Sequence, residues 1–139
     1  MFVRLLTMDH KHVPQAVAGA EMVSGAPVDG GAFVVSVPKN YDGLNAVVDP
    51  KLADCAKIAE GDIYNKEPTF VGERYATTEV DNPTALAVGN LLTVADGKWK
   101  KATSGTAEWK FGGEFTGHDY NVRLYIVMKV PETEASQVN

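Results

Sequence analysis

The residues best suited to metal chemistry are the three histidines. His10 and His12 are separated by one residue, so a strand would place both imidazoles on one face. His118 lies far away in the sequence, in a glycine-containing segment that is typical of a turn. A zinc site needs three or four well-placed ligands, whereas the first acidic residue after His12 is Glu21. We therefore interpret His10 and His12 as a solvated strand end and predict no metal and no other cofactor.

Groups suited to acid–base or nucleophilic catalysis are also sparse. A general acid–base pair needs a pocket that perturbs its pKa values, whereas the acids of this chain are scattered through turn-like segments. The turn Ser104-Gly105-Thr106 lacks the Gly-Lys-Ser/Thr sequence with which loops hold phosphate, and no serine lies in a nucleophile elbow. The sequence therefore predicts a binding or structural protein rather than an enzyme.

The length and net charge of the chain indicate a single domain and argue against some classes of partner. The chain of 139 residues is long enough for one domain with its own core, and its single cysteine, Cys55, cannot form an internal disulfide. A net charge of −5 argues against a general nucleic-acid binder, because affinity for the phosphate backbone comes from clustered Lys and Arg. No run approaches the roughly 18 apolar residues of a membrane helix, and the start lacks a signal-peptide pattern. We predict neither nucleic acid nor membrane as a partner.

The elements that would position any functional side chain are mostly short strands. Residues 89–130 alternate between apolar and polar positions and are divided by tight turns. Asp96-Gly97 lies between the apolar run Leu91–Val94 and Lys98-Trp99-Lys100, and it suits the positive φ values of a two-residue hairpin turn. In the following strand Trp109 and Phe111 share one face, so we expect both rings to pack inward.

The last strand has two distinct faces, and we expect the apolar one to face the core. The apolar face comprises Val122, Leu124, Ile126, Met128 and Val130, and the other comprises Arg123, Tyr125 and Lys129. Residues 131–139 are polar, so we expect a tail that is mobile or ordered only by a partner.

The first half of the chain predicts fewer and less regular strands. Phe2–Met8 alternates sufficiently for a first strand, and Ala32–Val37 and Leu44–Val48 are rich in residues that favour strands. Residues 65–83 are polar, which predicts a surface excursion with one edge strand at Thr69–Val71.

Residues 49–61 have two interpretations. One interpretation, which we prefer, is a short helix with Asp49 as its N-cap, Pro50 at its first position and Gly61 directly after its end. Alternatively, the segment from Cys55 to Tyr64 runs extended, because its apolar residues also suit a strand.

Together these patterns predict a mainly β protein, a small antiparallel β-barrel or sandwich with at most one short helix. The expected organisation is an N-terminal strand and extended arm over residues 1–16, a single β domain over 17–130 and a polar C-terminal tail over 131–139.

Two aromatic residues lie where either a core or an interface would use them. Trp99 stands between Lys98 and Lys100; if the lysines face water, the indole faces the core, which is the interpretation we favour. At a sheet edge or subunit boundary Trp99 would instead be an interface anchor. For Phe2, near the N-terminus, core and interface are equally supported.

The order of these features resembles the head decoration, or cement, proteins of tailed bacteriophages. Such chains have an early segment of the type Gly-x-x-Val-Asp-Gly-Gly-x-Phe-Val, here residues 25–34. A later segment of the type Val-Gly-Asn-Leu-Leu-Thr-Val-x-Asp-Gly-Lys follows, here residues 88–98, and residues 117–130 supply the closing turn and apolar strand. The similarity covers most of the chain from Gly25 onward, and its motifs are turns and strands.

The resemblance implies a virion protein, made in the cytoplasm of a bacterial host, that binds the outer surface of the assembled capsid. Its partner would be the major capsid protein, and a homo-oligomer such as a trimer is expected. Candidate capsid or subunit interface residues are Phe2, Arg4, Leu6 and Trp99. A ring component of the phage tail or neck is an alternative, and a cupin-like metal-binding protein using His10 and His12 is a weaker one.

Overall fold

The computed structural model describes residues 2–4, 14–29, 31–36, 57–119 and 122–135. These residues are mainly β and form a sandwich-like arrangement without a closed barrel, which confirms the predicted fold class. The one helical element among them is a 3-10 turn, η2 (Pro83–Ala85).

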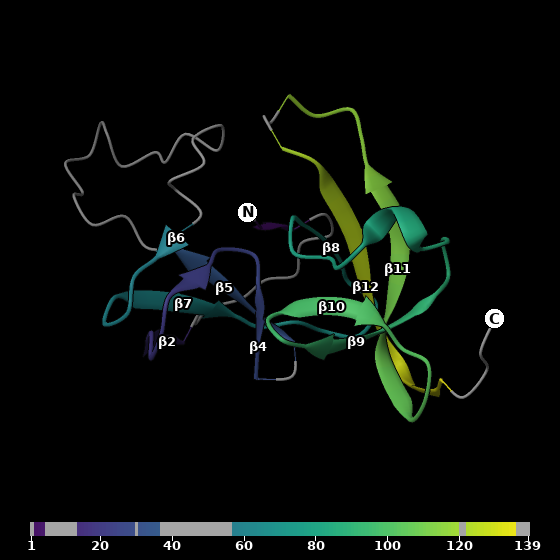
Figure 1. The fold of residues 1–139 in the computed structure, drawn as a ribbon, viewed down its shortest axis with the longest axis horizontal. Coiled ribbons are helices and arrows are strands. Elements are labelled where there is room, and N and C mark those ends of the chain that lie inside the picture. The colour runs from purple at the N-terminus through teal and green to yellow at the C-terminus, as the bar shows by residue number, and fades with distance from the viewer. Residues whose placement is uncertain (1, 5–13, 30, 37–56, 120–121, 136–139) are drawn as a thin grey trace.

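The larger sheet has six strands and lies on the right in Figure 1. Its spatial order is β1 (Phe2–Arg4), β8 (Arg74–Thr77), β12 (Leu124–Glu134), β11 (Thr106–Phe115), β9 (Leu91–Ala95) and β10 (Lys98–Lys101). All the pairings between these strands are antiparallel.

A four-stranded sheet and a two-stranded ribbon make up the rest of the described β structure. The four-stranded sheet, on the left in Figure 1, has the order β2 (Gln15–Val17), β7 (Ile63–Glu67), β5 (Ala32–Ser36) and β4 (Pro27–Val28). The ribbon pairs β3 (Met22–Val23) with β6 (Lys57–Ile58).

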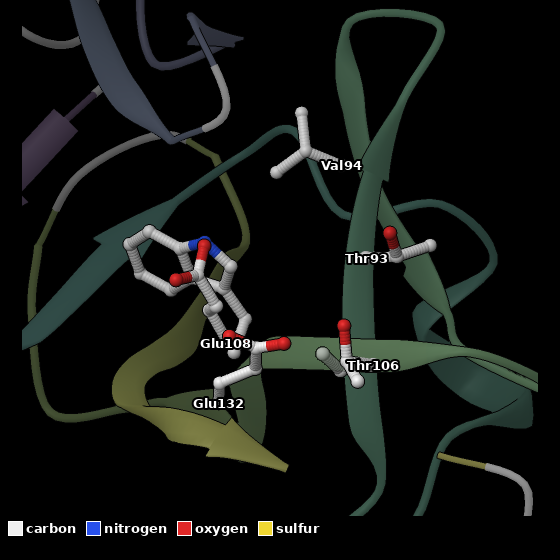
Figure 2. A pocket seen from close by; sticks show the side chains of 7 residues that line it. Thr93, Val94, Thr106, Glu108 and Glu132 are labelled. Carbon is white, nitrogen blue, oxygen red and sulfur yellow. The ribbon is translucent and has the colours of Figure 1, made fainter. Parts of the chain in front are cut away.

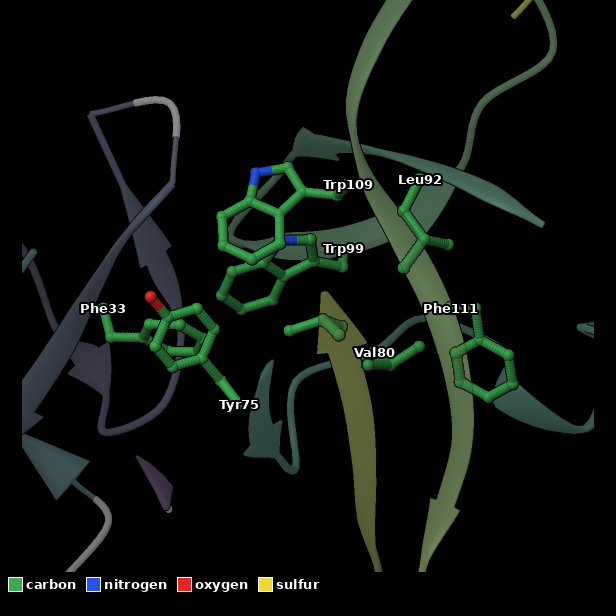
Figure 3. Packing of buried hydrophobic residues seen from close by; sticks show 8 residues of the cluster. Phe33, Tyr75, Val80, Leu92, Trp99, Trp109 and Phe111 are labelled. Atoms are coloured by element: carbon green, nitrogen blue, oxygen red, sulfur yellow. The ribbon is translucent and has the colours of Figure 1, made fainter. Parts of the chain in front are cut away.

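The two large sheets meet at a cluster that we call the aromatic core. Its buried members are Phe33, Tyr75, Val80, Leu92, Trp99, Trp109, Phe111 and Val127. Phe33 on β5 lies 4.7 Å from the ring of Trp99, and the two indoles are 5.3 Å apart and nearly perpendicular (Figure 3). Such rings contribute both large buried apolar areas and favourable edge contacts, so this cluster holds the sandwich together.

Gly31 allows the loop before β5 to approach the aromatic core. A Cβ atom at this position would lie 2.8 Å from Cζ2 of Trp109, and the backbone has a φ of +145° that side-chain-bearing residues rarely adopt. The glycine therefore serves the packing of the indole as well as the turn between β4 and β5.

The opposite face of the four-stranded sheet has a smaller core of its own. Val34 and Tyr64 pack there with Ala18 and Ile58. Because Phe33 and Val34 are adjacent on β5, that strand contributes to both cores, and its neighbouring side chains are each fully buried.

The strongest local predictions are confirmed. Asp96 and Gly97 have φ values of 54° and 71° and join β9 to β10 in a hairpin. Trp109 and Phe111 are both buried in the aromatic core. The strand expected at Ala32–Val37 is β5, as far as Ser36.

The prediction of a surface excursion over residues 65–83 is wrong at β8. This strand lies inside the six-stranded sheet, between β1 and β12, and Tyr75, Ala76 and Thr77 are each 0% exposed. The expected edge strand at Thr69–Val71 is also wrong, because these residues lead into a turn whose Gly72 has a φ of +95°.

The preferred helix over residues 49–61 is wrong for its described part, residues 57–61. Lys57 and Ile58 form β6, and a turn through Gly61, whose φ is 89°, leads into β7. Burial of Ile58 in the smaller core favours the extended conformation. A glycine with positive φ can end a helix or join two strands. Gly61 in the sequence therefore did not distinguish the helical from the extended interpretation of this segment.

The predicted core face of the last strand is also wrong in part. Val127 is fully buried in the aromatic core, with Tyr125 packed against the same cluster and Lys129 above the ring of Trp109. Leu124 is also fully buried, while Ile126, on the predicted face, is half-buried. The alternation itself holds, because residues 125–128 pair with β8 without a register shift. The face that the second sheet covers is the one with Tyr125, Val127 and Lys129, and the sequence of the strand does not show which face is covered.

β12 continues beyond the predicted end of the domain. It reaches Glu134, and Ala135 is buried beside Ala102 and Ala107, so these first residues of the expected mobile tail are part of the fold. The predicted strand at Leu44–Val48, residues 5–8 of the first strand and the end of the tail lie outside the described residues.

Candidate interaction surface

Exposed apolar side chains gather at two places on the described surface. Phe70 and Val71 are 38% and 58% exposed at the turn between β7 and β8. Val17 and Ile63 are 65% and 53% exposed and lie opposite each other on β2 and β7. Single exposed apolar residues are normal, whereas exposed apolar residues that lie together are candidates for contact with a partner.

Hydrogen bonds to buried groups fix the turn that presents Phe70 and Val71. The backbone N–H of Phe70 donates to the hydroxyl of Tyr75 over 2.9 Å, and that hydroxyl in turn donates to the carboxylate of Glu73. Tyr75 and Glu73 are 0% and 1% exposed. The backbone N–H of Gly72 donates to the carbonyl of Lys129 over 3.0 Å, which attaches the turn to β12.

The side chain of Thr69 connects this turn to its surroundings on two sides. Its hydroxyl donates to the carbonyl of Gly31 over 3.2 Å and lies 3.3 Å from Nζ of Lys129. The apolar tip is therefore preorganised, so a partner that binds it would order little additional chain.

The second exposed pair lies at the edge of the four-stranded sheet. β2 is the terminal strand of that sheet, and Val17 and Ile63 point to the same side as the neighbouring pair Gln15 and Asn65. The amide of Gln15 donates to the side-chain oxygen of Asn65 over 2.9 Å, which orders the polar end of this edge.

A groove of about 390 Å³ is lined by β9, the beginning of β11 and the end of β12. Thr93 and Val94 form one side, and the exposed carboxylates of Glu108 and Glu132 lie on the other (Figure 2). The carboxylates and hydroxyls of this groove could accept hydrogen bonds from a basic group. A metal site is not indicated there, because the described residues contain no group of three potential metal ligands.

The predicted interface residues lie in different environments. Trp99 is 0% exposed in the aromatic core, the alternative that the sequence favoured. Phe2 is half-buried, with its ring 4.3 Å from that of Phe33 and 5.8 Å from that of Tyr75. Arg4 is in β1, and Leu6 lies outside the described residues. Interface roles for Phe2, Arg4 and Leu6 stay predictions.

The structure does not bring the three histidines together within its described part. His10 and His12 lie outside the described residues, and the ring of His118 stacks on Phe115 at a centroid distance of 5.3 Å. No helix among the described residues is long and apolar enough to span a membrane.

Sequence reasoning missed both exposed pairs. Thr69-Phe70-Val71 has the composition of a short strand, and only the positive φ of Gly72 and the buried support from Tyr75 show that it is a fixed turn. Gly72 directly after the apolar triplet was the one available signal for that turn.

No protein-family model matches the chain, and no curated protein or solved structure is significantly similar to it.

Proposed function

We propose that this protein is a structural component of a tailed-phage virion, binding the outside of the assembled capsid and stabilising or decorating it. The observation that best supports the proposal is the rigid turn at Phe70 and Val71, because buried hydrogen-bonding groups hold two apolar side chains at the surface. The resemblance of residues 25–34 and 88–98 to head decoration proteins supports the capsid as the surface that it binds.

The physical requirements of such a role are modest. A protein that binds the mature shell better than its precursor or its dissociated subunits stabilises the shell by linkage alone. Each copy needs only a small contact, since many copies act on one particle. A homo-oligomer that engages neighbouring capsid subunits gains further from effective concentration.

Copy number separates a shell component from its nearest alternative. Quantitative mass spectrometry of purified particles should find hundreds of copies of the protein per virion, in a fixed ratio to the major capsid protein. A handful of copies that purify with tails would contradict the head assignment and favour a ring in the tail or neck.

Binding to heads gives a second, independent test. Purified protein should co-sediment with expanded heads that lack it, and the bound amount should saturate in a fixed ratio to the capsid subunit. Absence of saturable binding to both expanded heads and isolated tails would exclude the proposed function.

A further inference from the structure

The outer edge of β2 has backbone groups directed away from its own sheet. The backbone N–H of Ala18 donates to the carbonyl of Asp62 over 2.8 Å, and the N–H of Lys66 donates to the carbonyl of Pro14 over 2.8 Å. Every second residue of β2 bonds to the same neighbour, so the backbone groups of residues 14, 16 and 18 point toward the β7 side. In an antiparallel ladder the intervening residues point the other way. The N–H and C=O groups of Gln15 and Val17 therefore face the open edge.

Within the part of the chain that the structure describes, this edge shows none of the features with which proteins usually protect a terminal strand. Gln15, Ala16 and Val17 have no charge, whereas natural edges commonly have lysine, an inward charge or a covering loop. The edge strand β10 of the other sheet has such a cover: the backbone N–H of Trp99 donates to Glu79 and its carbonyl accepts from Asp81. On β2, by contrast, the side chain of Val17 is 65% exposed.

We propose that β2 pairs with β2 of a second copy of this chain, antiparallel and across a two-fold axis, to form one continuous eight-stranded sheet from two four-stranded ones. In the proposed register Val17 of one copy lies opposite Val17 of the other, and their outward backbone groups exchange two hydrogen bonds across the axis. A two-fold interface of this kind uses the same patch on both copies.

The side chains select a second copy as the occupant of this edge. With Val17 opposite Val17, each flanked by its own Ile63, four exposed β-branched residues form one apolar row across the interface. Such cross-strand pairs stabilise sheets, and the uncharged edge brings no like charges together on self-pairing. This inference does not depend on the proposed capsid function, because it concerns only two copies of the purified protein.

Sedimentation equilibrium of the purified full chain tests the proposal directly. We expect a concentration-dependent dimer for the wild type and at least about a tenfold higher dissociation constant for Val17→Asp, because the variant places two carboxylates on the axis. Val88→Asp is the matched control, since Val88 is 72% exposed and remote from β2 in the sequence. A monomeric wild type at about 1 mM, a weak-affinity limit, or an unchanged dimer in Val17→Asp, would overturn the proposal.

Cysteine cross-linking in a Cys55→Ser background tests the register. Hydrogen-bonded antiparallel partners have Cα atoms about 5.5 Å apart, which a disulfide can bridge, so Val17→Cys should form covalent dimers on mild oxidation. The two Gln15 residues would be separated by more than about 10 Å, so Gln15→Cys should stay monomeric under denaturing conditions. The opposite pattern, or no cross-link at either position, would contradict the proposed pairing.

Discussion

One face of the four-stranded sheet has a covered end and an exposed end. Phe33 and Val35 on β5 pack against the aromatic core, and Phe33 is 0% exposed. On the same face, two strands away, Val17 on β2 is 65% exposed. Apolar residues at both ends point to the same side of the sheet, although Val17 has the polar Gln15 as its neighbour on that face. The six-stranded sheet covers Phe33 and leaves Val17 exposed.

Residues at the covered end and at the exposed end of this face should affect different properties, namely stability and binding. Side chains at the covered end contribute to the free energy of unfolding, because they leave water when the chain folds. Val17 and Ile63 at the exposed end contribute little to folding and remain available to a partner. Substitutions at the two ends should therefore change different measured quantities.

The largest expected effect on stability comes from the centre of the covered end. Trp109→Ala should lower the free energy of unfolding by about 3–5 kcal/mol, because it leaves a cavity among Phe33, Tyr75 and Trp99. Denaturant unfolding measures the change. Phe115→Ala, on the same strand but outside the aromatic core, should have less than half this effect. Equal losses for the two variants would contradict a core centred on Trp109.

A smaller loss is expected where the loop before β5 approaches the indole. Gly31→Ala should destabilise the protein by about 1–3 kcal/mol, because its Cβ would clash with Trp109 and its φ would be strained. Gly19→Ala is the control, since no atom lies within 4 Å of the added Cβ and its φ is not positive. Thermal unfolding of both variants should separate them; a stable Gly31→Ala protein would show that the close approach is not needed.

Loss of one hydroxyl should loosen the turn at Phe70 and Val71. Tyr75→Phe removes the acceptor for the Phe70 N–H and the donor to buried Glu73, so we expect a loss of about 1–3 kcal/mol. Hydrogen exchange of the Phe70 amide should accelerate more than exchange in β11. Tyr125→Phe provides a control with the same chemical change at a half-buried site. Unchanged protection of Phe70 would mean that the hydroxyl does not hold the turn.

The smallest expected effect concerns an exposed ion pair in the β9–β10 hairpin. A hydrogen bond and the positive charge of Lys100, 2.8 Å away, lower the pKa of Asp96. Because the folded-state pKa is lowered, the small stabilisation is present above the unfolded-state pKa and is lost as the pH falls through the lowered value. Carboxyl NMR titration should show that Lys100→Gln raises the pKa of Asp96, while Lys110→Gln leaves it unchanged. No rise with Lys100→Gln would exclude the pair in solution.

Local signals explain which parts of the fold were predictable. Asp96-Gly97 and the alternation around Trp109 and Phe111 specify a hairpin and an inward face without reference to the rest of the chain. By contrast, β8 has only four residues, and its pairing with β1 on one side and β12 on the other places it inside the six-stranded sheet. Pairing with strands that are distant in the chain cannot be predicted from the sequence of β8 alone.

The candidate surface was less predictable than the fold for the same reason. Trp99 and Phe70 are both aromatic residues near polar neighbours, yet one is 0% exposed and the other 38%. Their difference arises from what packs over them, in the first case Phe33 from a strand more than sixty residues earlier in the chain. A sequence pattern identifies the apolar residues of a strand but does not show which of them another sheet covers.

Quantitative co-sedimentation with phage heads that lack the protein tests the central claim most directly. Wild-type protein should saturate the heads, and Phe70→Ser should bind at least about tenfold more weakly while its unfolding midpoint is unchanged, as for loss of an interface anchor. Val88→Ser, which also replaces an exposed apolar residue by serine, should bind like the wild type, since Val88 is 72% exposed and lies outside the turn. Equal binding by wild type and Phe70→Ser would contradict the claim that the turn at Phe70 and Val71 is the binding element.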